Sequence, residues 1–262
     1  MKPVVMTMDI NAVLEYFKIH YNDTTVKEAA DYFGYSESHF YRVFKKETGV
    51  TPQDYLVSLK VQNSVEQLLK TNASVLNIQL KSGYLSEGTF TNRIKKSMIL
   101  SPKQLTMQHY KIYSDYKLYE DDEPLEEVSE QADITVRLTS SETFEGIIFI
   151  GLFKKPIPNQ SPVIGKAILK FNKGRDVYFN DVPKGDYYCL ACVIHKTYNP
   201  LKIFVHKDNL RGRVEEKMTF PGKYKKNLNL RPPLPEDPPI TLNLPLLFIN
   251  ILKERKNEYR AD

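Results

Sequence analysis

The chain of 262 residues contains no tryptophan and only two cysteines, five histidines and eleven glycines. No apolar run approaches the roughly 20 residues that span a bilayer, and the N-terminus lacks a basic segment followed by an apolar one. We therefore expect a cytoplasmic protein with no membrane partner. With 41% hydrophobic and 26% charged residues, the composition is that of a globular protein of one or two domains.

The two cysteines, Cys189 and Cys192, form a lone Cys-x-x-Cys inside an apolar run that favours a strand. Residues three apart point to opposite faces of a strand, so we expect neither a disulfide nor a shared metal. A zinc site also needs more ligands, and the sequence has no second cysteine pair and no local cluster of histidines. We predict structural thiols, and neither a metal nor a cofactor.

Sequence motifs of common catalytic sites are also missing. The chain has no glycine-rich phosphate loop, no His-Glu pair typical of metalloproteases and no Gly-x-Ser-x-Gly elbow. No set of residues is thereby marked as catalytic. We expect that the protein is not an enzyme.

What the sequence does contain is an internal repeat. Residues 34–46 return about fifty positions later, in a variant form, as residues 83–96. The matched positions are Phe40 with Phe90, Phe44 with Ile94, Lys45-Lys46 with Lys95-Lys96, and Thr51-Pro52 with Ser101-Pro102. A chance origin is improbable for so long a matched set.

Each copy has the pattern of two helices joined by a turn that contains glycine, which is typical of a helix-turn-helix unit. In the first copy, Thr25 and Glu28 have the spacing of a capping box, which predicts a helix start. Gly34 suits the turn, because a residue without a Cβ takes the left-handed conformation at no steric cost. Ser36 is suited to cap the second helix. A longer helix from Pro52 to about residue 69 would join the two units.

Both units end in an aromatic-x-x-x-Phe/Ile-Lys-Lys run and a Ser/Thr-Pro step, and in this the chain resembles the AraC/XylS family over about residues 8–110. The resemblance implies a sequence-specific DNA-binding transcription regulator that places two helices in successive major grooves. Three residues depart from the family pattern. Asn92 stands where arginine is usual, Gln79 replaces a small residue, and Gly88 weakens a helix start, so weaker base reading by the second unit is expected.

The residues expected to contact DNA lie on the outward faces of the second helix of each unit. Lysines there would bind phosphates and fix the register, although a solvated helix face is the alternative for them. Arg42 is the strongest candidate for a base edge, and Asn92 suits adenine. The full set is Glu37, Ser38, Tyr41, Arg42, Lys45, Lys46, Ser86, Glu87, Thr89, Thr91, Asn92, Lys95 and Lys96.

Charge is distributed unevenly along the chain. Lysine and arginine set against aspartate and glutamate give +4 for residues 1–112, −8 for 113–133 and +9 for 134–262. The middle block, with its acidic run from Glu120 to Glu127, has few groups that build a core and is predicted to be a linker. It is either a plain tether or a segment that lies against a basic surface when DNA is absent.

From Ile134 onward the apolar residues alternate, as in strands. The Pro-x-Gly-x-Tyr pattern at residues 183–187 resembles transthyretin-like and carboxypeptidase-regulatory β-sandwiches. The predicted fold is therefore multidomain, with an all-α double helix-turn-helix domain (1–112) followed by an all-β, sandwich-like domain (134–262). Strands are expected at 134–138, 146–153, 167–171, 187–194, 201–206 and 240–252, with 221–239 as a long surface loop.

The role of the second domain is left open by the sequence. It would sense a ligand, mediate oligomerisation or contact another protein. Double-stranded DNA is the expected partner, while RNA polymerase, a small-molecule effector and a second copy of the chain stay open as further partners. The alternatives are an architectural DNA-binding protein, or a carbohydrate- or ligand-binding β domain tethered to DNA.

Overall fold

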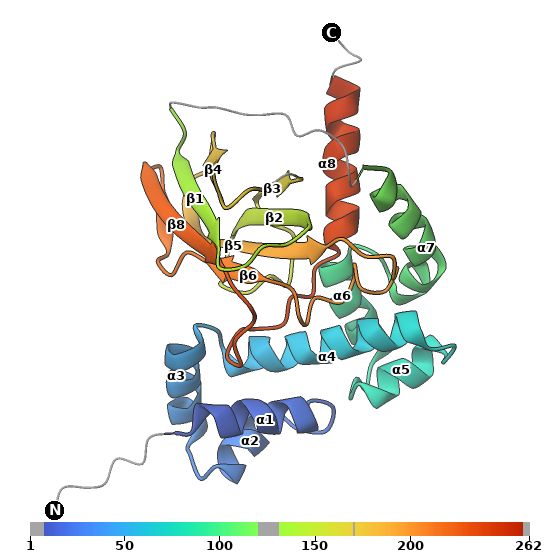
Figure 1. Cartoon of the computed structure of the whole chain (residues 1–262). Helices are drawn as coiled ribbons and strands as arrows, with labels where there is room; N and C mark the ends of the chain where they lie inside the picture. Colours follow the sequence, from blue (N-terminus) through green and yellow to red (C-terminus); the bar gives the residue numbers. More distant parts are fainter. Residues whose placement is uncertain (1–7, 120–130, 170, 259–262) are drawn as a thin grey trace, which may run out of the picture.

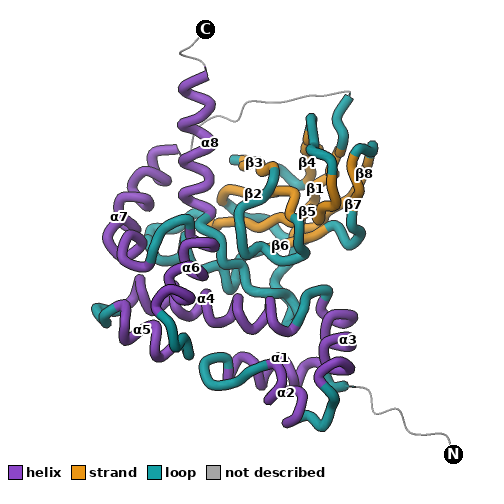
Figure 2. The backbone as a smooth tube through the Cα atoms, turned by 180° about the vertical axis from the view of Figure 1, so that it is seen from behind, coloured by secondary structure: helices purple, strands orange, loops and turns teal. Residues whose placement is uncertain are grey.

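The computed structural model describes residues 8–119, 131–169 and 171–258. A helical part comes first, a part built of two sheets follows, and a last helix packs back against the first part (Figures 1 and 2). The acidic run from residue 120 to 127 lies outside the described residues. Within them, no helix combines the length and the apolar character needed to span a membrane.

The helical part contains the two predicted helix-turn-helix units, joined by a long helix. The first unit consists of α1 (Ile10–His20), α2 (Val26–Tyr32) and α3 (Glu37–Thr48); the joining helix is α4 (Pro52–Lys70); the second unit consists of α5 (Val75–Lys81), α6 (Glu87–Met98) and α7 (Pro102–Tyr119). Helix α4 lies between the first unit and the sheets (Figure 1). The arrangement of these helices confirms the sequence prediction.

Local capping explains where the helices begin. Thr25 and Glu28 form the predicted capping box, with each side chain accepting a hydrogen bond from the other residue's amide. Ser101 and Gln104 do the same at the start of α7. Pro52 occupies the first turn of α4, where its missing amide leaves no hydrogen bond unmade.

Helix α7 runs further than the sequence suggested. It continues to Tyr119, past the end of the predicted helical domain at residue 112 and into the segment predicted as linker. Tyr116 is fully buried and packs edge-on against Phe248 of the last helix. The start of the linker at residue 113 is therefore wrong, because an apolar face continues the helix.

The second part of the chain is formed by two sheets. The smaller sheet has the order β4-β1-β8, from β1 (Ile134–Ser140), β4 (Gly174–Phe179) and β8 (Tyr224–Leu230). The larger sheet has the order β3-β2-β5-β6, with β7 also paired to β5; its strands are β2 (Gly146–Phe153), β3 (Ile164–Ile168), β5 (Gly185–His195), β6 (Arg211–Arg213) and β7 (Met218–Phe220). Strands β1 and β8 are parallel, and the other pairs are antiparallel.

The larger sheet is covered on both faces. One face packs against the smaller sheet through alternating apolar side chains, including Val136, Ile150 and Val193, and this is a sandwich core. The opposite face packs against helices, and its Phe149 contacts Phe248 edge-on. The sandwich class is confirmed, with a helical layer added outside it.

Several strand predictions need correction. Strand β8 lies inside residues 221–239, which were predicted as a loop, because proline and lysine there masked the alternation of Tyr224, Lys226 and Leu228. Residues 201–204 form turns and residues 205–206 have no regular structure, so the strand predicted there is absent. The strand expected at 167–171 is β3, which begins earlier at Ile164 and ends at Ile168.

The last apolar segment is a helix, so the strand predicted at residues 240–252 is wrong. Helix α8 (Leu244–Glu258) begins after Asn243, whose side chain accepts a hydrogen bond from the amide of Leu246. Pro245 falls in its first turn, where proline is tolerated. The apolar residues of the segment recur at helical spacing: Leu244, Leu247, Phe248, Ile251 and Leu252.

The two cysteines lie on opposite faces of β5, as predicted. Cys189 belongs to the core between the sheets and Cys192 to the core beneath the helices. Both thiols are free and buried, and burial raises the pKa of Cys189 to about 12 and that of Cys192 to about 11. Neutral thiols packed among apolar side chains fit a structural role.

The glycines of the two turns provide a matched test of how the units pack. Gly34 and Gly83 both have positive φ, but a Cβ on Gly83 would lie 1.9 Å from the carbonyl oxygen of Asn22, while none of the described atoms lies within 4 Å of one on Gly34. Gly34→Ala should therefore cost about 1 to 2 kcal/mol of unfolding free energy from backbone strain alone. Gly83→Ala should cost about 1 to 3 kcal/mol more, because the first unit must move. Equal losses in denaturant titrations would contradict this contact.

Candidate nucleic-acid interface

Helices α3 and α6, which we call the reading helices, begin in the same way. The hydroxyl of Ser36 accepts a hydrogen bond from the amide of His39 at 3.4 Å. The hydroxyl of Ser86 accepts one from the amide of Thr89 at 3.2 Å. Each serine thus satisfies an amide that the helix itself leaves without a partner.

One face of each reading helix is anchored in its own apolar core. Phe40 and Phe44 of α3 are fully buried beside Phe17 of α1. Phe90 and Ile94 of α6 are equally buried in the core of the second unit. Because these positions repeat with a spacing of fifty residues, both helices present corresponding faces outward.

The outward faces carry what we call the reading stripes, each built from positions i, i+3, i+4 and i+7 of a helix. On α3 the stripe is His39, Arg42, Val43 and Lys46, and on α6 it is Thr89, Asn92, Arg93 and Lys96. Arg42 and Lys46 are exposed, as are all four residues on α6. The cationic ends of both stripes are therefore open to solvent and are not covered by the described residues of the sheets.

Of the thirteen residues predicted from the sequence, five belong to these stripes: Arg42, Lys46, Thr89, Asn92 and Lys96. Tyr41 and Thr91 are half-buried. The others are exposed: Glu37, Ser38, Arg42, Lys45, Lys46, Ser86, Glu87, Thr89, Asn92, Lys95 and Lys96. Their exposure leaves them accessible to a partner, and their contact with DNA stays a prediction.

Two polar residues of the stripes were missed from the sequence. His39 lies one turn before Arg42, and its Nδ1 is 3.2 Å from Nη2 of the arginine, which donates to the ring. Arg93 follows Asn92, which is the residue that aligns with Arg42 in the repeat. It gives the second unit a guanidinium one position further along the helix. Helical spacing from Lys46 and Lys96 back along each helix points to both residues.

Tyr41, half-buried on the side of α3 away from the stripe, keeps its proton. Burial, and then the nearby carboxylates of Glu37 and Asp54, raise the pKa of its hydroxyl above the usual value of 10.0. A protonated phenol is both a donor and an acceptor. It is therefore suited to donate a hydrogen bond to a phosphate oxygen.

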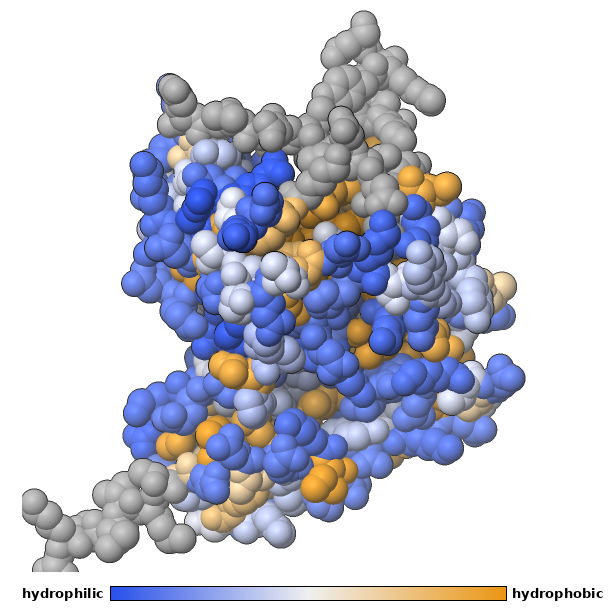
Figure 3. Space-filling view, in the orientation of Figure 1, coloured by the Kyte–Doolittle hydropathy of each residue, from blue (hydrophilic) through white to orange (hydrophobic). Residues whose placement is uncertain are grey.

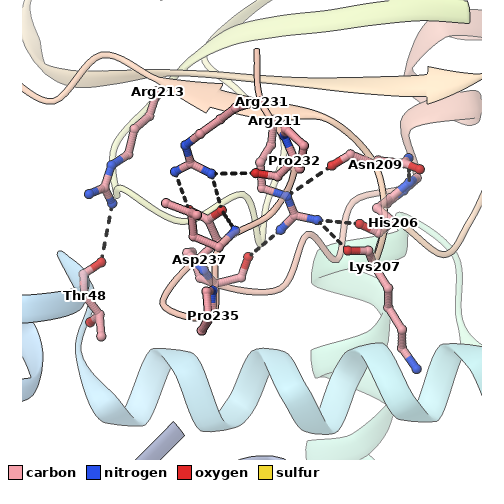
Figure 4. Close-up of polar contacts among 12 residues, drawn as sticks. Thr48, His206, Lys207, Asn209, Arg211, Arg213, Arg231, Pro232, Pro235 and Asp237 are labelled. Carbon is pink, nitrogen blue, oxygen red and sulfur yellow. Dashed lines mark hydrogen bonds and ion pairs between the residues drawn. The ribbon is translucent and has the colours of Figure 1, made fainter. Parts of the chain in front are cut away.

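The C-terminal ends of the two reading helices are held at equivalent positions by residues of the β region. Nη1 of Arg213 on β6 donates to the carbonyl of Thr48 at 3.4 Å (Figure 4). Nδ2 of Asn243, before α8, donates to the carbonyl of Met98 at 3.1 Å. The last carbonyls of a helix have no hydrogen-bond partner within the helix, and these two side chains donate to such carbonyls.

The ends themselves turn with positive φ, which is 78° at Gly49 and 66° at Ile99. Glycine takes this conformation freely, whereas a β-branched residue is strained in it. The second reading helix therefore needs outside support at its end more than the first. Asn243 supplies it at Met98, and the hydroxyl of Ser97 donates to the carbonyl of Asn159 at 3.2 Å.

A buried polar network fixes the β region above α4 (Figure 4). Arg211, only 8% exposed, donates to the carbonyls of His206, Lys207, Asn209 and Pro238. Its charge is thus solvated by peptide dipoles in place of water.

The same region touches α4 directly. The hydroxyl of Tyr55 donates to the carbonyl of Pro235 at 3.4 Å, and Lys155 pairs with Asp54 at 3.0 Å. Lys207 also pairs with Glu66. Contacts at both halves of α4 hold the spacing helix against the sheets.

His206 within this network is neutral. Burial first, and the nearby Arg211 as well, lower its pKa to about 4. Its Nε2 donates to the carbonyl of Leu242 at 3.1 Å, and its Nδ1 accepts from Asn209 at 3.1 Å. With both nitrogens engaged, it has a structural role; across the described ranges, no three His, Cys, Asp or Glu side chains are placed to hold a metal ion.

Residues 29–108 match a family model described as a helix-turn-helix domain. Two similar proteins are uncharacterised HTH-type transcriptional regulators. One, from Staphylococcus aureus (strain MSSA476), is 29% identical over 96 residues, which are 36% of this chain and 13% of that protein. The other, from Haemophilus influenzae, is 32% identical over 83 residues, which are 32% of this chain and 28% of that protein. The chain thus spans less than a third of either relative.

Solved structures similar to the helical part include the DNA-binding domain of AdpA in complex with a target DNA, with a TM-score of 0.37 at 19% identity over 39% of this chain and 93% of that one. The C-terminal domain of AraT, a response regulator from Geobacillus stearothermophilus, has a TM-score of 0.37 at 24% identity over 39% of this chain and 88% of that one. The sequence match defines residues 29–108 as a helix-turn-helix domain. For this part of the chain, the resemblance to the AraC/XylS family is confirmed.

The ion pair between Arg231 and Asp237 gives a pH-dependent prediction for the network. Asp237 accepts hydrogen bonds from Arg231 at 2.7 and 3.0 Å and from the amide of Leu234 at 2.8 Å. Burial alone would raise the pKa of Asp237, but these bonds outweigh it and the pKa lies below 3.8. The contribution to stability is therefore present above the unfolded value of about 3.9 and is lost as the pH falls below it.

Asp237→Asn should lower the free energy of unfolding at pH 7, and the difference from wild type should shrink below about pH 4. Asp208→Asn is the charge-matched control, since Asp208 is exposed. Chemical denaturation at a series of pH values measures both differences. A difference for Asp237→Asn that is constant from pH 7 to pH 3 would contradict the assignment.

Proposed function

We propose that the protein is a sequence-specific DNA-binding transcription regulator whose two reading helices enter successive major grooves. The observation that carries the proposal is the duplicated reading stripe, which on both α3 and α6 has an exposed cationic part that ends in a lysine. Lysines at the stripe ends would bind phosphates, while the arginines within them suit base edges. DNA is thus the partner that both stripes fit.

The length of α4 supports binding of both helices to one face of a duplex. Its 19 residues extend about 28 Å at the helical rise of 1.5 Å per residue. Successive major grooves on one side of DNA are about 34 Å apart. Because the ends of α4 are held against the sheets, the separation of the two units is fixed before DNA is met.

We further propose that the β region modulates DNA binding through the ends of the reading helices. Arg213 and Asn243 contact the carbonyls of Thr48 and Met98 at equivalent positions of the repeat. A shift of β6 or of the segment before α8 would therefore move a reading helix directly, through one of these hydrogen bonds.

Arg42 should contribute specificity. Arg42→Ala should weaken binding to the selected site by about 1 to 3 kcal/mol and binding to random DNA much less. Arg42→Lys is the matched control: it keeps the charge but loses the two-pronged geometry, so it should retain affinity for random DNA and lose discrimination. Fluorescence anisotropy with both DNAs at several salt concentrations measures this. Equal losses on the two DNAs would make Arg42 a phosphate contact and favour an architectural DNA binder.

Arg93 should read the half-site of the second unit. In selections from a randomised DNA pool, Arg42→Ala should reduce base preference in one half-site and Arg93→Ala in the other, about one helical turn away. Loss in the same half-site for both variants would argue against two separate reading helices.

The same selection on the wild-type protein tests whether the second unit reads bases more weakly, as its departures from the family pattern suggest. Equal information in both halves would contradict that expectation.

A further inference from the structure

A pocket of about 310 Å³ lies between the helical face of the larger sheet and the start of α8. Apolar side chains dominate its lining and include Phe149, Phe153, Leu190, Leu242 and Leu247. In Figure 3, hydrophobic residues gather on this face where β2 and β3 approach α8. Protein interiors contain few voids larger than a water molecule, and a space of this size falls in the range of small-ligand sites.

The chemistry of the lining selects the class of ligand. Lys166 is the single charged residue beside the pocket, but it shares its face of β3 with Ile164 and Ile168, which pack into the other core. Its ammonium lies 5.9 Å from the ring of Phe179 in that core. No charged side chain among the lining residues therefore faces the pocket, and a charged ligand would lose its hydration without compensation.

The wall of the pocket opposite α8 is built on a pair of glycines. Gly151 of β2 and Gly165 of β3 are register partners, and Pro162 lies against both. A Cβ on Gly151 would come within 2.8 Å of Pro162. The loop that precedes β3 is thus seated on the sheet and forms one side of the pocket.

The walls of the pocket are bonded to the second reading helix. Two segments that line the pocket, residues 158–163 and 240–244, are joined by a hydrogen bond from the amide of Thr241 to the carbonyl of Pro158 at 3.2 Å. One segment accepts from Ser97 at the carbonyl of Asn159, and the other donates to Met98 from Asn243. A molecule in the pocket would therefore contact two segments that are both hydrogen-bonded to the C-terminal end of α6.

We propose that this pocket binds a small, uncharged, apolar molecule, and that its occupation raises the affinity for DNA by holding α6 in place. The second half of this inference rests on the proposed function; the first half does not. A filled pocket packs both walls against the ligand, which stabilises the contacts to Ser97 and Met98. The site is separate from the reading stripes, so ligand and DNA do not compete for the same residues.

The uncharged fluorophore N-phenyl-1-naphthylamine is a suitable probe, because its emission rises in apolar surroundings. Titration of the full chain should show saturable binding. Leu247→Trp, which fills the pocket, should weaken it at least about tenfold, which corresponds to about 1.4 kcal/mol. Leu246→Trp is the matched control, since Leu246 is also half-buried on α8 but does not line the pocket, and it should bind the probe like wild type.

Val163→Trp provides a second blocking variant, and it does not require α8 to accommodate a tryptophan. Val163 lines the pocket from the loop and is 38% exposed, so a larger side chain there leaves the core intact. Thermal melting of each variant checks that it is folded. Absence of saturable binding, or equal binding by the wild type and both blocking variants, would overturn the pocket.

The coupling to DNA has its own readout. The probe should raise the DNA affinity of the wild-type protein about fivefold or more, and this effect should vanish in Asn243→Ser. Serine keeps an acceptor for the amide of Leu246 but is too short to reach Met98. Unchanged or lowered affinity in the wild type, or the same response in Asn243→Ser, would overturn the coupling. Saturable probe binding without any DNA binding would instead overturn the proposed function and leave the pocket standing.

Discussion

The packing of the larger sheet against the second helix-turn-helix unit is the interaction on which the rest of the structure depends. One continuous apolar core extends from Val65 of α4 through Phe90 and Ile94 of α6 to Phe149 of β2 and Phe248 of α8. Burial of apolar surface contributes roughly 25 cal/mol per Å², so a core shared by helices and sheet makes each part stabilise the other. The second unit is consequently part of the same folded body as the β region.

The first unit is attached in a different way. Its core around Phe17, Phe44 and Tyr55 is its own, and Ile157 is the one residue of the β region that joins the buried residues described for it. Polar contacts also lie here: Arg213 donates to the carbonyl of Thr48, and Lys155 forms a largely exposed ion pair with Asp54 at the start of α4. Exposed ion pairs contribute little, typically below about 1 kcal/mol. The first unit is therefore the less firmly held of the two, although their sequences are copies.

Sequence reasoning succeeded where structure is determined locally. Helix starts at Ser36 and Ser101 depend on side chains within three residues, and the repeat fixed which helices correspond. It failed where partners are distant in the sequence. The parallel pairing of β1 with β8 joins residues about ninety positions apart, and no local pattern signals it. The segment that became α8 was ambiguous, because a short apolar run fits a buried strand as well as a buried helix.

The candidate interface shows the same division. Exposed positions on α3 and α6 followed from helical spacing, but Arg93 escaped notice because alignment of the copies pairs it with Val43, a half-buried residue. The hydrogen bonds from the β region to Thr48 and Met98 could not be predicted from the sequence, because their donors lie more than a hundred residues away.

Under the proposed modulation, those two links would also distinguish the units in function. The donor to Met98 comes from a wall of the apolar pocket, whereas the donor to Thr48 comes from β6, which does not line it. A ligand in the pocket would therefore act on one reading helix and leave the other as it was. Because affinity for a two-part site depends on both halves being engaged together, control of one helix is enough to change binding to the whole site.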